Sequence, residues 1–287
     1  MESMERKITE NLLKEYGRYL YKEEKSTATI NKYLSDIRKL MIYADEKEIT
    51  KELMIQYKEY LMNEKHYKST SINSYLVAAN RFFDYMGWYG LGVKTIKMQR
   101  TVFAPEEKEL TKNDFKKLVN TARELGRTKI SMIIQTICST GMRVGEIRYV
   151  TVNSVLKGQV TVYNKGKERV ILMQRSLQKK LLAYIRKKGI KSGMVFCTSG
   201  GKPMDRTYIW REMKKLCGSA GVPQSRVFPH NLRALFAKTY YTMFKDIAML
   251  ADILGHSNIE TTRIYIKKTS SKHRAQLDRL GLLDGLG

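Results

Sequence analysis

Residues 230–265 read HNLRALFAKTYYTMFKDIAMLADILGHSNIETTRIY, with apolar side chains that recur at intervals of three and four. This spacing is typical of amphipathic helices, and Pro229 is a residue type favoured in the first turn of a helix. Gly255 has the character of a helix C-cap, which would place His256 in a tight turn. We expect helices near residues 230–244, 246–254 and 258–267, and a further one near 271–280.

The chain before this stretch changes its hydrophobic period. Thr111 and Asp114 have the spacing of a capping box, and helices are predicted at 112–125, 128–139, 143–150, 176–188 and 206–219. Residues 159–163 and 169–173 alternate, are rich in Val and Ile, and flank a polar turn that contains Gly166. This pattern predicts a β-hairpin, and residues 194–197 are expected to form a short third strand.

The first hundred residues show only helical periodicity, over 8–24, 27–45, 50–64 and 69–86. The periodicity then lapses between residues 93 and 108 in a basic segment that ends near Pro105, which is typical of a connector. We expect a helical bundle at residues 1–97, a linker at 98–108 and a second domain at 109–287. The predicted fold class is mainly α with a small antiparallel β-sheet.

The charge of the chain is large and unevenly placed. Lys and Arg number 53 against 28 Asp and Glu, a net charge of +25. Residues 1–100 contain 18 basic and 14 acidic side chains, and residues 101–287 contain 35 and 14, so the two halves carry +4 and +21. This imbalance favours a nucleic acid partner over a membrane surface. The charge alone is also compatible with a basic surface that is only solvated and binds no nucleic acid.

The cysteines and the N-terminal residues indicate the compartment. Cys138, Cys197 and Cys217 are widely spaced, so neither a disulfide framework nor a zinc site is expected. No signal-peptide pattern opens the chain and no apolar run reaches the ~18 residues of a membrane span. We expect a protein of the cytoplasm, associated with the nucleoid, that contacts no membrane.

Two histidines, an arginine and a tyrosine are the candidate chemical groups of residues 230–265. His230 and Arg233 lie one helical turn apart and would face the same way, as two ligands for a phosphate or as an ordinary surface pair. The His256 side chain, in a tight turn, could point at a ligand instead of packing in the core. Tyr265 could attack a phosphate, or it could be a core aromatic with its hydroxyl at the rim.

Two further basic residues lie upstream. Arg143 follows Gly141 at a predicted helix start, where the helix dipole favours an anion, although Glu146 is an alternative partner. Lys165 lies in the predicted hairpin turn, where lysines commonly serve only solubility.

The order and spacing of these residues resemble the tyrosine recombinase (phage integrase) family, of the two-domain kind. The family's pattern is Arg, hairpin Lys, His-x-x-Arg, Leu-Gly-His and Tyr, and it is found here at Arg143, Lys165, His230, Arg233, His256 and Tyr265. The resemblance covers nearly the whole chain. Two departures are Ala234, where a second histidine is common, and the sequence Asn-Lys-Gly-Lys at 164–167, which makes Lys167 an alternative to Lys165.

The resemblance implies how a phosphate would be held. Arg143, Arg233 and His256 would donate to the non-bridging oxygens of the scissile phosphodiester, whose negative charge grows in the transition state. Guanidinium groups suit this task because they bind two oxygens at once and keep their charge. The resemblance implies no cofactor and no metal.

The resemblance also implies the covalent step. Tyr265 would attack phosphorus and form a 3′-phosphotyrosyl bond, with His230 as general base and Lys165 as general acid for the 5′-oxygen. Strand exchange would proceed through a Holliday junction, for integration, excision or inversion.

The partners implied are double-stranded DNA with specific core sites, a homotetramer of two dimers, and an accessory directionality factor. The two domains would form a C-shaped clamp on DNA, and the C-terminal helix would dock on a neighbouring protomer or pack in its own. A type IB topoisomerase and a non-catalytic DNA-binding regulator are the alternative functions.

Overall fold

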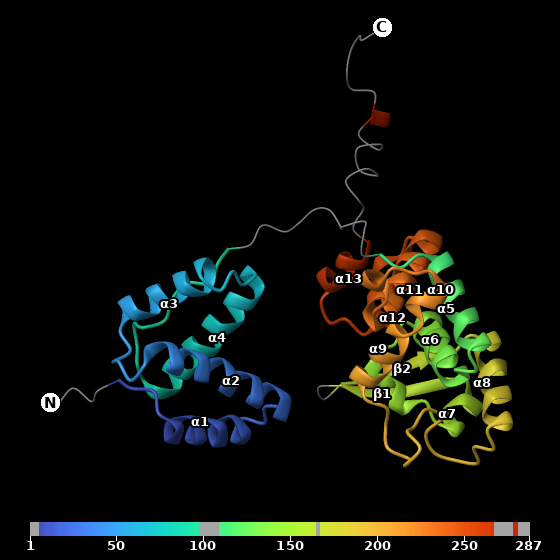
Figure 1. Cartoon of the computed structure of the whole chain (residues 1–287), viewed down its shortest axis with the longest axis horizontal. Coiled ribbons are helices and arrows are strands. Elements are labelled where there is room, and N and C mark those ends of the chain that lie inside the picture. Colours follow the sequence, from blue (N-terminus) through green and yellow to red (C-terminus); the bar gives the residue numbers. More distant parts are fainter. Residues whose placement is uncertain (1–5, 98–108, 165–166, 267–277, 281–287) are drawn as a thin grey trace, which may run out of the picture. The chain divides into compact units, whose positions relative to one another are not determined.

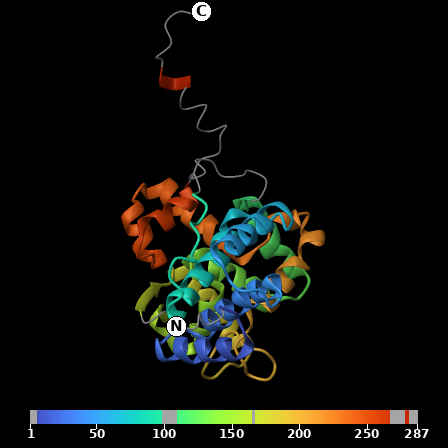
Figure 2. The same ribbon diagram turned by 90° about the vertical axis from the view of Figure 1, so that its left-hand side faces the viewer.

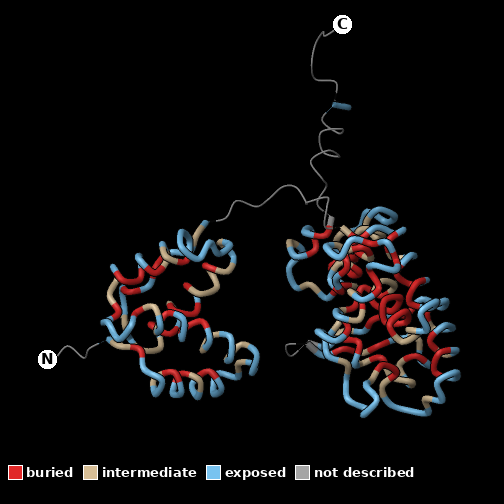
Figure 3. The backbone as a smooth tube through the Cα atoms, in the orientation of Figure 1, coloured by how far each residue is buried: buried red, intermediate tan, exposed pale blue. Residues whose placement is uncertain are grey.

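The computed structural model describes residues 6–97, 109–164, 167–266 and 278–280. The chain divides into two compact units, Met1–Arg100 and Thr101–Gly287. Each unit has a hydrophobic core of its own, visible as buried backbone in the interior of each (Figure 3).

The described residues of the first unit form helices and no strand, as predicted. Its helices are α1 (Glu10–Lys22), α2 (Thr27–Ala44), α3 (Lys51–Asn63) and α4 (Ser69–Met86). The side-chain oxygens of Thr9, Ser26 and Thr50 cap the first three helices and satisfy amides that have no partner within the helix. Tyr16 and Phe82 pack edge to face in the core, with ring centroids 5.2 Å apart.

The second unit combines helices with one small sheet (Figure 1). Its elements up to the sheet are α5 (Lys112–Glu124), α6 (Thr128–Thr140), the 3₁₀ helix η2 (Val144–Tyr149), α7 (Val152–Lys157), β1 (Gln159–Asn164) and β2 (Lys167–Leu172). There follow α8 (Arg175–Lys187), α9 (Arg206–Lys214), α10 (Cys217–Ala220), η3 (Gln224–Arg226), α11 (Pro229–Phe244), α12 (Ile247–Leu254), α13 (Ile259–Ile266) and η4 (Asp278–Leu280).

Helix α6 is the centre of the second unit. Every residue from Ile130 to Ile137 is buried, because α5 and α11 pack against it. Its buried polar side chains, such as Ser131 and Thr136, donate to backbone carbonyls, which allows the helix to be buried on all sides. α6 ends at Gly141, which caps it in the left-handed conformation.

The sheet has two strands rather than three. β1 and β2 are antiparallel, with Gln159 opposite Leu172 and Asn164 opposite Lys167. The predicted strand at 194–197 is wrong: within the described residues this segment makes only isolated bridges, at Met194 and at Cys197. Its apolar character reflects the burial of Val195 and Phe196 in the core and not a strand.

Three predicted helices differ in the structure. Residues 143–150 form the 3₁₀ helix η2, and residues 206–219 divide into α9 and α10. Gly145 lies within η2, and glycine weakens an α-helix; the break between α9 and α10 falls at Lys215 and Leu216. Most of the helix expected at 271–280 lies outside the described residues, and Asp278–Leu280 is a 3₁₀ turn.

Helices α11, α12 and α13 pack against one another at one end of the second unit (Figures 1 and 2). Ala237, Leu250, Leu254 and Tyr265 form a small separate core between them. No helix in the parts of the chain that the structure describes is both long and apolar enough to cross a bilayer.

Candidate active site

Helix α11 carries two of the predicted residues in its first turns. Pro229 occupies the start of the helix, where an amide hydrogen would have no partner. Buried Leu232 and Leu235 hold the helix against the core. His230 remains exposed, whereas Arg233 turns inward and is only 3% exposed.

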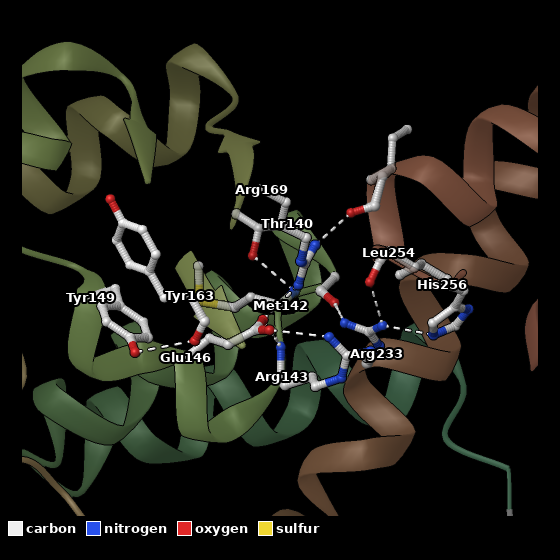
Figure 4. A network of polar contacts seen from close by, with 12 residues as sticks. Thr140, Met142, Arg143, Glu146, Tyr149, Tyr163, Arg169, Arg233, Leu254 and His256 are labelled. Carbon is white, nitrogen blue, oxygen red and sulfur yellow. Dashed lines mark hydrogen bonds and ion pairs between the residues drawn. The ribbon is translucent and has the colours of Figure 1, made fainter. Parts of the chain in front are cut away.

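The guanidinium of Arg233 lies between two helix ends (Figure 4). Nη1 donates to the carbonyl oxygen of Gly141 at 2.6 Å, and Nη2 donates to that of Leu254 at 2.8 Å. These carbonyls close α6 and α12, where the helix dipole is negative and carbonyls lack partners. Burial and the charge of Arg143 lower the pKa of Arg233 to about 10, against the opposing effect of Tyr265. Arg233 is therefore cationic at neutral pH.

Gly141 is required for this arrangement. Its φ is +67°, and a Cβ atom there would lie 2.5 Å from Cδ1 of Phe236 and 3.0 Å from a methyl group of Leu254. Only glycine can bring the end of α6 this close to α11. The Gly141 carbonyl is consequently available to Arg233.

His256 lies in the turn after α12 and contacts groups on two helices. Its Nε2 is 2.9 Å from Nη2 of Arg233, and its Nδ1 is 2.8 Å from Oγ1 of Thr262. Burial, followed by the charges of Arg233 and Arg143, lowers the pKa of His256 to about 4. The imidazole is therefore neutral at pH 7.

Tyr265 packs between the two histidines. Its ring centroid lies 5.3 Å from that of His230 and 5.9 Å from that of His256, and the latter pair is stacked with an interplanar angle of 14°. The residue is 7% exposed. Tyr265 is therefore a core aromatic of α13 that also lies beside the candidate phosphate ligands.

His230 is the more accessible of the two histidines. Partial desolvation, with the positive charge of Arg233, lowers its pKa below the usual value. The lowered pKa favours the neutral imidazole, which is able to accept a proton. Ala234, on the next turn of α11, packs against the small core that contains Tyr265.

Arg143 is fixed by Glu146, the alternative partner considered from the sequence. The Glu146 carboxylate, on η2, accepts from the Arg143 backbone at 2.7 Å and from its Nη1 at 3.1 Å. Burial alone would raise the pKa of Glu146, but the Arg143 amide and Arg169 lower it overall. The Arg143 side chain remains 37% exposed, so pairing with Glu146 leaves it accessible to an anion.

Arg169 connects β2 to the turn that carries His256. Its Nη2 donates to Glu146 at 2.6 Å and its Nη1 to the carbonyl of Ile253, also at 2.6 Å. A Cβ atom on Gly255 would lie 2.4 Å from Cδ of Arg169. The missing side chain at Gly255 thus makes room for Arg169.

Lys165 lies outside the described residues. β1 is anchored near the turn, because the Tyr149 hydroxyl of η2 donates to the carbonyl of Tyr163 at 3.2 Å. Lys167, the alternative lysine, opens β2 opposite Asn164.

The structure brings Arg143, His230, Arg233, His256 and Tyr265 into one region from four separate elements. Arg169 and Thr262 were missed from the sequence. Arg169 lies on the same strand face as buried Ile171, and a charge on a buried strand face is the signal that could have found it. Thr262 precedes Tyr265 by one helical turn, which places both on one face of α13.

The donor set of the site is that of an anion receptor. Guanidinium groups and imidazoles converge, and among the described residues no group of three or more His, Cys, Asp and Glu could hold a metal ion. Cys138, Cys197 and Cys217 are free thiols.

The comparison with protein families connects this arrangement to a known class. Residues 108–272, more than half of the chain, match the model of the phage integrase family. The chain belongs to the phage integrase family. Residues 13–90 match the N-terminal SAM-like domain of phage integrases, so both units have counterparts in the family.

Curated relatives of this phage integrase are recombinases. Tyrosine recombinase XerA of Pyrococcus furiosus is 26% identical over 291 residues, which cover 98% of this chain and 98% of the relative. Tyrosine recombinase XerD of Vibrio cholerae is 24% identical and covers 83% and 84%. The chain is a tyrosine-type site-specific recombinase, and the topoisomerase and regulator alternatives are not favoured.

Solved structures establish the fold of this recombinase. A lambda integrase dimer bound to a COC′ core site has a TM-score of 0.73 at 16% identity, covering 91% of this chain and 96% of that one. XerH site-specific recombinase bound to palindromic difH, a post-cleavage complex, has a TM-score of 0.69 at 18% identity, covering 88% and 79%. The predicted family and fold class are confirmed.

Proposed function

We propose that Tyr265 is the nucleophile with which this recombinase cleaves one strand of duplex DNA. The observation that carries the proposal is the place of its ring, stacked on His256, beside His230 and next to Arg233. A nucleophile surrounded by cationic and imidazole groups of its own chain has both a phosphate ligand and a base within reach.

In the proposed reaction the Tyr265 oxygen attacks phosphorus. A bond forms between this oxygen and phosphorus, and the bond from phosphorus to the 5′-oxygen breaks, which leaves a 3′-phosphotyrosine and a 5′-hydroxyl. A phenol holds its proton at neutral pH, so neutral His230 accepts that proton. Lys165, as the general acid, donates a proton to the departing 5′-oxygen.

Arg143 and Arg233 stabilise the transition state in this proposal. The phosphodiester gains negative charge as the phosphorus becomes pentacoordinate, so fixed donors lower the barrier. The Arg143 side chain is accessible while Glu146 fixes its backbone. Arg233 is held by two helix ends, so little reorganisation accompanies the reaction. His256 donates to a third position on the phosphate.

The assembly is proposed by analogy with a solved neighbour. A lambda integrase tetramer has been solved on a Holliday junction, with a TM-score of 0.70 to this chain. We propose that four protomers, as two dimers, hold two duplexes at specific core sites and exchange strands through such a junction.

Residues 1–97 would form the core-binding domain, 98–108 a linker and 109–287 the catalytic domain, closing as a C-shaped clamp. The C-terminal helix would dock between protomers, and a directionality factor and nucleoid association belong to the same proposal.

The test is an assay for a covalent protein–DNA adduct on a nicked duplex that carries the core site, found by mapping cleavage on flanking DNA. Tyr265→Phe should abolish the adduct, because the variant lacks the attacking oxygen, and should bind DNA as the wild type does. Tyr163→Phe is the matched control: Tyr163 is exposed and lies on β1 of the hairpin. An adduct that survives Tyr265→Phe would show that another residue is the nucleophile.

A further inference from the structure

The hydrogen bonds of Arg233, His256 and Thr262 form a chain whose direction is fixed at one end. An arginine side chain only donates hydrogen bonds. Its Nη2 lies 2.9 Å from Nε2 of His256, so Nε2 must accept. In the neutral imidazole the proton is then on Nδ1, which donates to Oγ1 of Thr262 at 2.8 Å.

This tautomer cannot serve the proposed reaction as it stands. With its proton on Nδ1, His256 has no N–H group on the Nε2 side, where Arg233 lies. To donate to a phosphate oxygen from Nε2, the neutral imidazole must release the Nδ1 proton to water and take one from water on Nε2, an exchange that takes place while the ring is released from Thr262. Nδ1 then becomes an acceptor and needs a donor in the same place.

Thr262 can fill both roles. A hydroxyl donates or accepts by rotating about its C–O bond. The side chain is fully buried, with 0% exposure, so water cannot replace it at Nδ1. Its hydrogen bond to His256 spans from α13 to the turn after α12. Tyr265 lies three residues further along α13, on the same face.

We propose that Thr262 is a positioning residue that switches the His256 tautomer, accepting from Nδ1 in the DNA-free protein and donating to it once a phosphate has displaced His256 from Arg233. The inference rests on the proposed function and deepens it. Because Thr262 and Tyr265 share α13, His256 becomes a phosphate donor only while the helix that carries the nucleophile is docked. The nucleophile and one of its phosphate ligands are thereby assembled together.

Thr262→Val and Thr262→Ser test the role in cleavage. Valine keeps the β-branched shape and removes the hydroxyl, whereas serine keeps the hydroxyl. Loss of one hydrogen bond from the transition state should slow single-turnover adduct formation roughly tenfold in Thr262→Val, and Thr262→Ser should stay near the wild-type rate. A Thr262→Val rate equal to that of the wild type would overturn the inference.

A double variant separates action through His256 from a general loss of packing. If Thr262 acts through His256, adding Thr262→Val to His256→Ala should slow adduct formation no further. Effects that multiply would show that Thr262 acts elsewhere. If His256→Ala alone forms the adduct at the wild-type rate, the proposed role of His256 fails first, and that result is distinct from a failure of Thr262 alone.

The tautomer itself is measurable without activity. The chain contains four histidines, so ¹⁵N-histidine labelling gives a simple spectrum in which His256→Ala identifies the resonance of interest. In the DNA-free wild type we expect the proton on Nδ1. A proton on Nε2 in that state would overturn the inference, whether or not Thr262→Val folds.

Discussion

Arg233 keeps its positive charge at 3% exposure because a backbone carbonyl accepts from each of its two Nη atoms. Two main-chain carbonyls and one imidazole nitrogen surround its fork. The two carbonyls do not titrate, so the guanidinium stays oriented without a buried carboxylate as partner. A carboxylate there would compete with a phosphate for the same donors, whereas neutral carbonyls orient the group and leave its charge available.

Arg233→Lys should show what the planar fork contributes. A lysine keeps the charge but cannot reach the Gly141 and Leu254 carbonyls together, so both the site and the helix ends lose their fixed geometry. We expect adduct formation to fall by roughly 10²–10³-fold and the melting temperature to drop. Arg263→Lys is the matched control, since Arg263 lies on α13 and its side chain is 60% exposed. Equal effects of the two substitutions would contradict this account of Arg233.

His256 should make stability depend on pH. Its pKa in the folded protein is lowered to about 4, while an unfolded histidine titrates near ~6.5. The unfolded chain therefore binds the proton first, and the contribution of the neutral imidazole, complete above about pH 6.5, is lost as the pH falls toward 4. Urea unfolding at pH 7.5 and pH 5.0 should show a larger loss of stability for the wild type than for His256→Gln. The same difference with His66→Gln, an exposed histidine, would refute the assignment.

At the scale of elements, the site depends on how closely β2 approaches the turn between α12 and α13. Arg169 donates to the Ile253 carbonyl at the end of α12. Gly255 leaves room for the Arg169 side chain because it has no Cβ atom. The same guanidinium holds Glu146, which fixes the Arg143 backbone. Arg169 and Glu146 thus connect β2, η2 and the end of α12.

Gly255→Ala should break that connection. The φ of Gly255 is +65°, and a Cβ would lie 2.4 Å from Arg169, so the substitution combines backbone strain with displacement of Arg169. Gly126→Ala is the matched control, because its φ is +68° with nothing within 4 Å of the new Cβ. We expect a loss of about 1–2 kcal/mol for Gly126→Ala and of roughly 1–3 kcal/mol more for Gly255→Ala, measured by urea unfolding. Equal losses would mean that Arg169 moves aside at little cost.

The elements also show what the sequence could predict. Helices with a clear apolar stripe, such as α1 to α4, were found within a few residues because burial of one face dictates their period. The run around Val195 and Phe196 predicts a strand wrongly, because an apolar run has the same appearance in a buried loop. The pattern of Arg143, His230, Arg233, His256 and Tyr265 was read from spacing, whereas Thr262 and Arg169 act through contacts between distant segments. Such contacts have no local signature.

At the scale of the whole molecule, the two cores are separate and the charge is divided unequally between the units. Residues 1–100 carry +4 and residues 101–287 carry +21. Non-specific DNA affinity arises mainly from phosphates neutralised by Lys and Arg, with release of counterions. The second unit should therefore dominate the dependence of binding on salt, although the first unit matches a domain of its own within the family.

Residues 101–287 produced alone should fold and keep most of the salt dependence of DNA binding. A separate core is sufficient for an independent unit, and the slope of log Kd against log salt counts the phosphate contacts rather than the strength of any one of them. We expect the isolated unit to retain more than half of the slope of the full chain on a non-specific duplex, measured by fluorescence anisotropy between about 50 and 200 mM salt. Residues 1–100 alone are the complementary control, with a shallow slope expected from their small net charge. A steeper slope for residues 1–100 than for residues 101–287 would show that local clusters of charge, and not the net charge of each unit, determine the contact with DNA.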